Sequence, residues 1–182
     1  TIDESVKRDG SYSFRNTLAD ITPVCRATDG LHREGINHGS ITPESIMISN
    51  GGKVKLIDFF LNFDSGRASD SPFTAPENRK SGEKSAKGDI YSLCAVLYYM
   101  LTGKEPVEVS PEELKKCPEL TDEAADAVLK GMSENPELRQ DTAEEILAVL
   151  NGRKSSFKLD ENFDIRSENE ESEKNTKPKR PD

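Results

Sequence analysis

The amino-acid sequence predicts a mainly α fold, α+β overall, in which a helical bundle surrounds one buried central helix beside one small β-hairpin. Residues 90–101 are apolar on nearly every face and are followed by Gly103, a pattern typical of a helix buried on all sides. Two short apolar and β-branched runs, 45–49 and 53–57, flank an Asn-Gly-Gly turn that tolerates positive φ and indicates a hairpin. Capped helical segments fill the C-terminal half.

The first long element is predicted to be a helix over residues 13–33. Leu18, Ile21, Cys25 and Leu31 recur at near-helical spacing, and the pattern stops before Gly35. The preceding residues, 1–12, are interpreted as an N-terminal extension or lead-in. We therefore expect the hydrophobic core to lie within residues 13–150.

Three further helices are predicted after the central helix, each from its own capping residues. Residues 110–113 read as a capping box with proline at the first helical position, and Thr121 and Thr142 precede the other two helices. The connection from 62 to 88 is rich in Ser, Asp, Gly and Pro and exceeds the length of an ordinary loop. A functional or regulatory loop is expected there.

The chain is predicted to form one compact unit over residues 13–152, followed by a polar tail over 153–182. Residues 167–182 contain no aliphatic or aromatic side chain. Such a segment cannot bury enough apolar surface to offset the entropy lost on ordering. We expect a disordered tail or linker.

Charge and composition exclude several classes of function. The net charge of -9 disfavours binding to phosphate backbones, so no nucleic-acid partner is expected. The longest apolar stretch, Leu93–Leu101, has about half the roughly 20 residues that a bilayer crossing needs, so we expect no direct membrane insertion. The cysteines 25, 94 and 117 have no metal-site or disulfide spacing and indicate a reducing, cytoplasmic setting.

Several motifs occur in a fixed order along the chain: LHREGINHGSITPESIMI, the hairpin, LIDFF, TAPE and GDIYSLCAVLYYMLTGKEP. This series resembles the C-terminal lobe of a protein kinase, and in style it is similar to bacterial serine/threonine kinases. The kinase pattern H-R-D-L-x-x-x-N aligns with residues 38–45, D-F-G with 58–60 and A-P-E with 75–77. The resemblance covers about residues 13–150. No Gly-rich loop or kinase lysine precedes residue 13, so the N-terminal lobe is expected to be absent.

The positions that would carry phosphotransfer chemistry depart from the kinase pattern. By the resemblance, Ser40 replaces the proton-accepting aspartate, Thr42 the loop lysine and Ser45 the asparagine that holds the second Mg²⁺. A serine hydroxyl accepts no proton near neutral pH and is a poor ligand for Mg²⁺. Gly39 stands where the family arginine receives an activation-loop phosphate. His38 is expected to be a packed core histidine.

One carboxylate survives among the metal ligands that the resemblance implies. Asp58 aligns with the D-F-G aspartate and would hold Mg²⁺ only weakly by itself, because the ion needs several oxygen ligands. The plainer interpretation is a loop carboxylate at the end of a strand. Phe60 replaces the flexible glycine of D-F-G and is expected to restrict that loop.

Motifs with architectural roles in the family are retained. The resemblance implies that Asp89 caps backbone amides of the catalytic loop and that Glu77 pairs with Arg139. It also implies that Phe59 and His38 stack towards the central helix. Residues with structural roles in the family are thus retained, whereas residues with roles in phosphotransfer are not.

These observations predict a pseudokinase, a catalytically inactive kinase-like domain that acts as a regulatory or scaffolding module for protein interactions. The alternative is a divergent serine/threonine protein kinase whose N-terminal lobe supplies ATP binding. No cofactor is expected for this segment, and ATP and Mg²⁺ belong to the alternative. We expect protein partners, such as an active kinase or its own N-terminal lobe. The expected location is the cytoplasm or the cytoplasmic side of a membrane-anchored parent.

Overall fold

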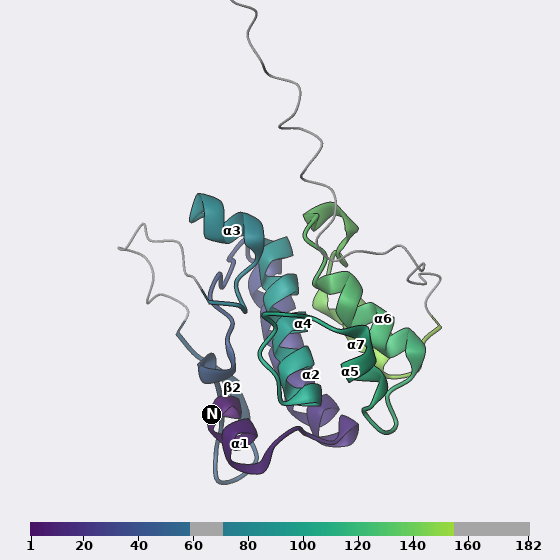
Figure 1. The fold of residues 1–182 in the computed structure, drawn as a ribbon. Helices are drawn as coiled ribbons and strands as arrows, with labels where there is room; N and C mark the ends of the chain where they lie inside the picture. The colour runs from purple at the N-terminus through teal and green to yellow at the C-terminus, as the bar shows by residue number, and fades with distance from the viewer. Residues whose placement is uncertain (59–70, 155–182) are drawn as a thin grey trace, which may run out of the picture.

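The computed structural model describes residues 1–58 and 71–154 and shows a bundle of helices with one two-stranded antiparallel sheet at its side (Figure 1). The predicted mainly helical fold with one hairpin is confirmed. In chain order the elements are α1 (Ile2–Asp9), α2 (Phe14–Arg33), η1 (Pro43–Ser45), β1 (Ile46–Ile48), β2 (Val54–Leu56), α3 (Pro76–Ser81), α4 (Ala86–Thr102), α5 (Pro111–Lys115), α6 (Asp122–Gly131), η2 (Pro136–Leu138) and α7 (Ala143–Leu150).

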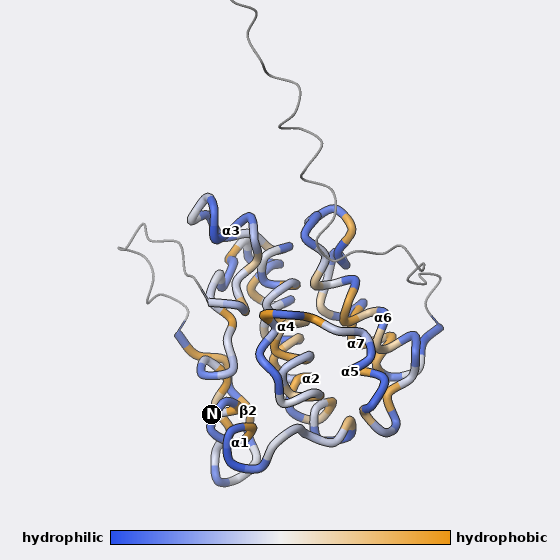
Figure 2. The backbone as a smooth tube through the Cα atoms, in the orientation of Figure 1, coloured by the Kyte–Doolittle hydropathy of each residue, from blue (hydrophilic) through white to orange (hydrophobic). Residues whose placement is uncertain are grey.

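Helix α4 is the centre of the core. The Ser85 side chain caps its start by accepting a hydrogen bond from the Gly88 amide, and Gly103 ends it in the left-handed conformation at φ 71°. Every residue from Gly88 to Leu101 is buried. Helices α2, α5 and α6 pack directly on α4, and α7 closes the bundle against α2 and α6. In Figure 2 hydrophobic positions lie along α6 and α7, whereas α3 is hydrophilic.

Helix α1 extends the core beyond its predicted limit. Residues 1–12 contain a helix, Ile2–Asp9, and its Ile2 and Val6 side chains are 0% and 4% exposed and belong to the core. Thr1 and Glu4 form a reciprocal capping box that starts the helix. The prediction that the core begins at residue 13 is therefore wrong. Two apolar residues one helical turn apart are enough to join a short helix to the core when the helix is capped and has a surface to pack on.

The hairpin is shorter than predicted. Strands β1 and β2 pair antiparallel, with Ile46 opposite Leu56 and Met47 opposite Lys55. Ile46 and Leu56 are buried against the helices, whereas Met47 and Lys55 are exposed on the outer face. This alternation gives the sheet one buried side, as expected for an antiparallel pair.

Two local predictions are corrected by the structure. Part of the long connection predicted over 62–88 is helical, because α3 and the first turn of α4 lie within it, and residues 59–70 fall outside the described part of the chain. The capping box predicted at 110–113 does not form, since the Ser110 hydroxyl donates to the Glu112 carboxylate at 2.9 Å instead of capping α5.

Other sequence predictions concern caps, cysteines and membrane spans. Thr121 and Thr142 cap α6 and α7 as predicted. The three cysteines are free and buried, and burial raises the pKa of the Cys94 thiol to about 12. No helix in the described ranges is long and apolar enough to cross a membrane. Residues 155–182 of the predicted tail lie outside the part of the chain that the structure describes, so the tail stays a prediction.

The close packing of α6 on α4 predicts opposite effects for two glycine substitutions. A Cβ at Gly131 would overlap the Cys94 Sγ and lie 3.0 Å from the Cys94 Cβ, so Gly131→Ala should destabilise the fold by about 1–3 kcal/mol. A Cβ at Gly30, inside α2, meets nothing within 4 Å, so Gly30→Ala should stabilise by up to about 1 kcal/mol. Urea unfolding of both variants measures the difference. A stability gain in Gly131→Ala would contradict the packing.

Candidate functional site

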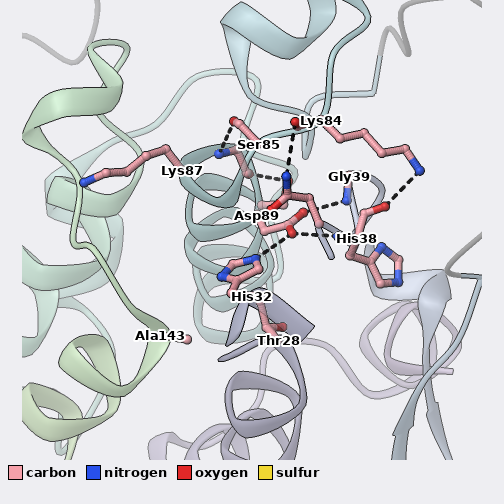
Figure 3. Close-up of polar contacts among 12 residues, drawn as sticks. Thr28, His32, His38, Gly39, Lys84, Ser85, Lys87, Asp89 and Ala143 are labelled. Carbon is pink, nitrogen blue, oxygen red and sulfur yellow. Dashed lines mark hydrogen bonds and ion pairs between the residues drawn. The ribbon is translucent and has the colours of Figure 1, made fainter. Parts of the chain in front are cut away.

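The Asp89 carboxylate lies at the centre of a polar network at the start of α4 (Figure 3). It is 0% exposed. Its Oδ1 accepts a hydrogen bond from the Gly39 amide at 2.7 Å, and its Oδ2 accepts one from the His38 amide at 2.8 Å. The same Oδ2 lies 2.8 Å from Nε2 of His32, at the end of α2. One buried carboxylate therefore joins the 38–39 loop to two helices.

Local backbone geometry explains why this loop reaches the carboxylate. Gly39 has φ 72°, a left-handed conformation that glycine adopts without steric strain. That conformation allows two successive amides to face the same acceptor. Asp89 itself lies in the first turn of α4, where the helix dipole favours a negative charge.

His38 connects the same loop to the end of the hairpin. Its Nε2 lies 2.9 Å from the Ile57 carbonyl oxygen, and its Nδ1 accepts the Ser40 amide at 3.3 Å. With Nδ1 acting as acceptor, Nε2 carries the proton and the imidazole is neutral. Burial lowers the pKa of His38, and this effect outweighs the opposing influence of the Ile57 carbonyl and Asp89.

Lys84 fills the space beside Gly39. A Cβ at Gly39 would overlap the Lys84 side chain. The Lys84 ammonium donates to the His38 carbonyl at 3.1 Å, and the Asn37 side-chain amide donates to the Lys84 carbonyl at 3.3 Å. A larger residue at position 39 would have to displace this lysine and adopt a strained φ.

The structure brings Thr42 and Ser45 together in one turn. The Ser45 hydroxyl donates to the Thr42 carbonyl at 2.9 Å and accepts from the Thr42 amide at 2.9 Å. Ser45 is only 2% exposed. Its oxygen is thus directed at the backbone of its own loop, where it closes η1.

Asp58 is exposed at the end of β2, with a positive φ of 70° that is unusual for a residue with a side chain. Phe59 and Phe60 lie outside the described residues, so their predicted roles are not tested. Among the described residues, no group of three or more His, Cys, Asp or Glu side chains is arranged to hold a metal ion. The weak metal-binding role of Asp58 stays a prediction.

Glu77 and Arg139 form a bidentate ion pair between α3 and the segment after η2, with N–O distances of 2.6 and 2.9 Å. The Arg139 side chain is 0% exposed, and its guanidinium carbon lies 5.0 Å from the Tyr91 ring centroid. Its remaining hydrogen bonds go to backbone carbonyls of Ser133 (2.8 Å), Lys87 (3.0 Å) and Glu134 (3.2 Å). This arginine ties α3, α4 and η2 together.

Three residues of this framework, Asp29, His32 and Lys84, are not predicted from the sequence. Asp29 on α2 accepts hydrogen bonds from the Ala143 and Glu144 amides, both at 2.8 Å, and so caps the N-terminus of α7. His32 contacts the Asp89 carboxylate, and Lys84 donates to the His38 carbonyl. The partners of Asp29 lie 114 and 115 residues away in sequence, so no local pattern could indicate them.

The sequence of this chain is similar to those of known protein kinases. A family model described as "Protein kinase domain" matches residues 2–157. The chain is 30% identical over 175 residues to serine/threonine-protein kinase PknB of Mycolicibacterium smegmatis, covering 82% of this chain and 28% of that protein. It is 31% identical over 178 residues to the probable serine/threonine-protein kinase CE0033 of Corynebacterium efficiens, covering 80% and 26%. The chain thus spans little more than a quarter of these relatives' length.

The neutral state of His38 predicts a pH dependence of stability. Above its ordinary pKa of 6.5 the imidazole is neutral in both the folded and the unfolded chain. As pH falls below that value, the unfolded chain takes up a proton before the folded one, because burial lowers the folded-state pKa, and stability falls. We expect the free energy of unfolding, measured in urea from about pH 7.5 to about pH 5, to fall more steeply in the wild type than in His38→Gln. Parallel profiles would contradict this.

Two ion pairs near the start of α4 should differ in their effect on stability. Glu77→Gln leaves the buried Arg139 charge without its anion and should cost about 2–3 kcal/mol, a value reduced because Glu77 is 31% exposed. Asp141→Asn removes the partner of Lys87, but Asp141 is 78% exposed and the loss should stay below about 1 kcal/mol. Urea unfolding at neutral pH compares the two. Equal losses would show that Arg139 does not depend on Glu77.

Proposed function

The chain belongs to the protein kinase domain family, and from this premise we propose that it is a catalytically inactive member with the fold of the C-terminal lobe. Its function would be that of a regulatory or scaffolding module for protein interactions. The observation that carries the proposal is the state of Ser45, whose hydroxyl is bonded twice within its own turn.

Metal binding at Ser45 would compete with the structure of the loop. In active kinases this position supplies an asparagine ligand to Mg²⁺. To reach a cation, Ser45 would have to give up both hydrogen bonds to Thr42 and leave a site where it is 2% exposed. Mg²⁺ demands several well-placed oxygen ligands, and a single neutral hydroxyl offers little compensation.

The neighbouring positions support the same proposal. Ser40 stands where a kinase needs a carboxylate to accept the substrate proton, and a serine hydroxyl does not act as that base near neutral pH. At position 39 a glycine packed against Lys84 replaces the arginine that would receive a phosphate. Asp89 and Arg139, by contrast, keep buried and well-bonded positions. A rigid frame without the reacting groups suits recognition better than catalysis.

Proposed partners are proteins, including an active kinase or an N-terminal lobe. The net charge of -9 favours partners with basic surfaces. A cytoplasmic location follows from the predicted reduced state of the cysteines and is part of the proposal. ATP and Mg²⁺ would be required only if the protein were a divergent active kinase.

A phosphotransfer assay tests the proposal on the complete natural polypeptide that carries this chain. Incubation with radiolabelled ATP, Mg²⁺ and a generic basic protein substrate should give no incorporation above the background, and Mg-ATP should leave the thermal unfolding midpoint unchanged. Mg²⁺-dependent incorporation that Asp58→Asn abolishes and Asp141→Asn preserves would overturn the proposal. That result would establish the divergent kinase instead.

A further inference from the structure

A polar pocket of about 320 Å³ lies between the C-terminal end of α1 and the N-terminal half of α2. None of the residues of the candidate functional site lines it. The side chains that matter for its chemistry are those of Arg8, Asp9, Tyr12, Asn16 and Asp20. Its volume is at the lower end of the range of about 300–1,000 Å³ for small-molecule sites, which suits a head group better than a nucleotide.

The walls of the pocket are held in place by the fold. The Tyr12 amide donates to the Met100 carbonyl at 2.7 Å, which pins the α1–α2 connection to the end of α4. The Ser13 hydroxyl accepts the Asn16 amide at 3.2 Å and starts α2. A pocket whose walls are already ordered loses little conformational entropy when a ligand binds.

The charges around the pocket do not balance. Arg8 is bidentate on Asp9, with N–O distances of 2.9 and 2.6 Å, so these two groups neutralise each other. The Asp20 carboxylate makes no hydrogen bond or ion pair with the described part of the chain. Partial burial raises the pKa of Asp20. The pocket therefore carries one unbalanced negative charge.

We propose that this pocket binds an organic cation, an ammonium or guanidinium group, with Asp20 as its counter-ion. A bare metal ion is a poorer match, because metals require several anionic or carbonyl ligands and only one carboxylate here lacks a partner. Tyr12 and Asn16 also line the pocket, and aromatic rings and amide oxygens are groups that favour a cation. This inference does not depend on the proposed pseudokinase function.

The cation has two possible sources, a free small amine or a basic side chain of a partner protein. Titrations of the full ¹⁵N-labelled chain with agmatine and with a blocked Ala-Arg-Ala peptide distinguish them. We expect saturable amide shifts confined to residues 5–20. Tighter binding of the peptide assigns the site to a protein partner, and tighter binding of agmatine assigns it to a free amine.

Two variants that each remove one negative charge separate specific from general attraction. Asp20→Asn should weaken binding about tenfold or more, because it removes the counter-ion while keeping the side-chain shape. Glu34→Gln, at the exposed end of α2, should bind as the wild type does. In the wild type, the carboxyl ¹³C signal of Asp20 should titrate at lower pH when the ligand is bound. Absence of saturable shifts, or unchanged binding by Asp20→Asn, would overturn the proposal.

Discussion

The fully buried carboxylate of Asp89 is the interaction on which the arrangement of the candidate site depends. A charge removed from water is tolerated only when hydrogen bonds replace its hydration. Here the replacements come from the His38 and Gly39 amides and from the His32 imidazole. The loop has to lie where its amides reach Asp89, because any other position leaves the charge unsolvated. The buried carboxylate therefore sets the position of the 38–39 loop.

A second buried charge completes the same frame. Arg139 uses its guanidinium to join Glu77 of α3 to backbone carbonyls around η2 and at the start of α4. Asp89 and Lys87, which contacts the Arg139 carbonyl at 2.9 Å, lie within the same first turns of α4. The N-terminal end of α4 is thus linked to α2, α3 and η2 by buried polar contacts. The rest of the helix packs through apolar side chains.

The parts of the fold that sequence could predict are those specified within a few residues. The all-round apolar face of α4 and the threonine caps of α6 and α7 are local signals, and each is present as an element. Helix α1 also has a local signal, the Thr1 and Glu4 capping box. The burial of its two core residues, however, depends on packing against elements that are distant in sequence. At Ser110 the hydroxyl donates a hydrogen bond to the Glu112 carboxylate, so it does not form the predicted cap.

Contacts over long sequence separation explain the rest. The Glu77 and Arg139 contact could be anticipated only through resemblance to a family, whereas the Asp29 cap on α7 and the Lys84 contact with His38 had no such guide. These long-range contacts leave few unsatisfied polar groups around Asp89 in the described part of the chain. Around Asp89 the ionic and polar groups largely satisfy one another, as Lys84 does on the His38 carbonyl and Ser45 on Thr42. A polar network whose members satisfy one another holds these segments in one rigid arrangement. Incomplete pairing at Asp20, in the pocket between α1 and α2, is the kind of feature that a binding partner completes.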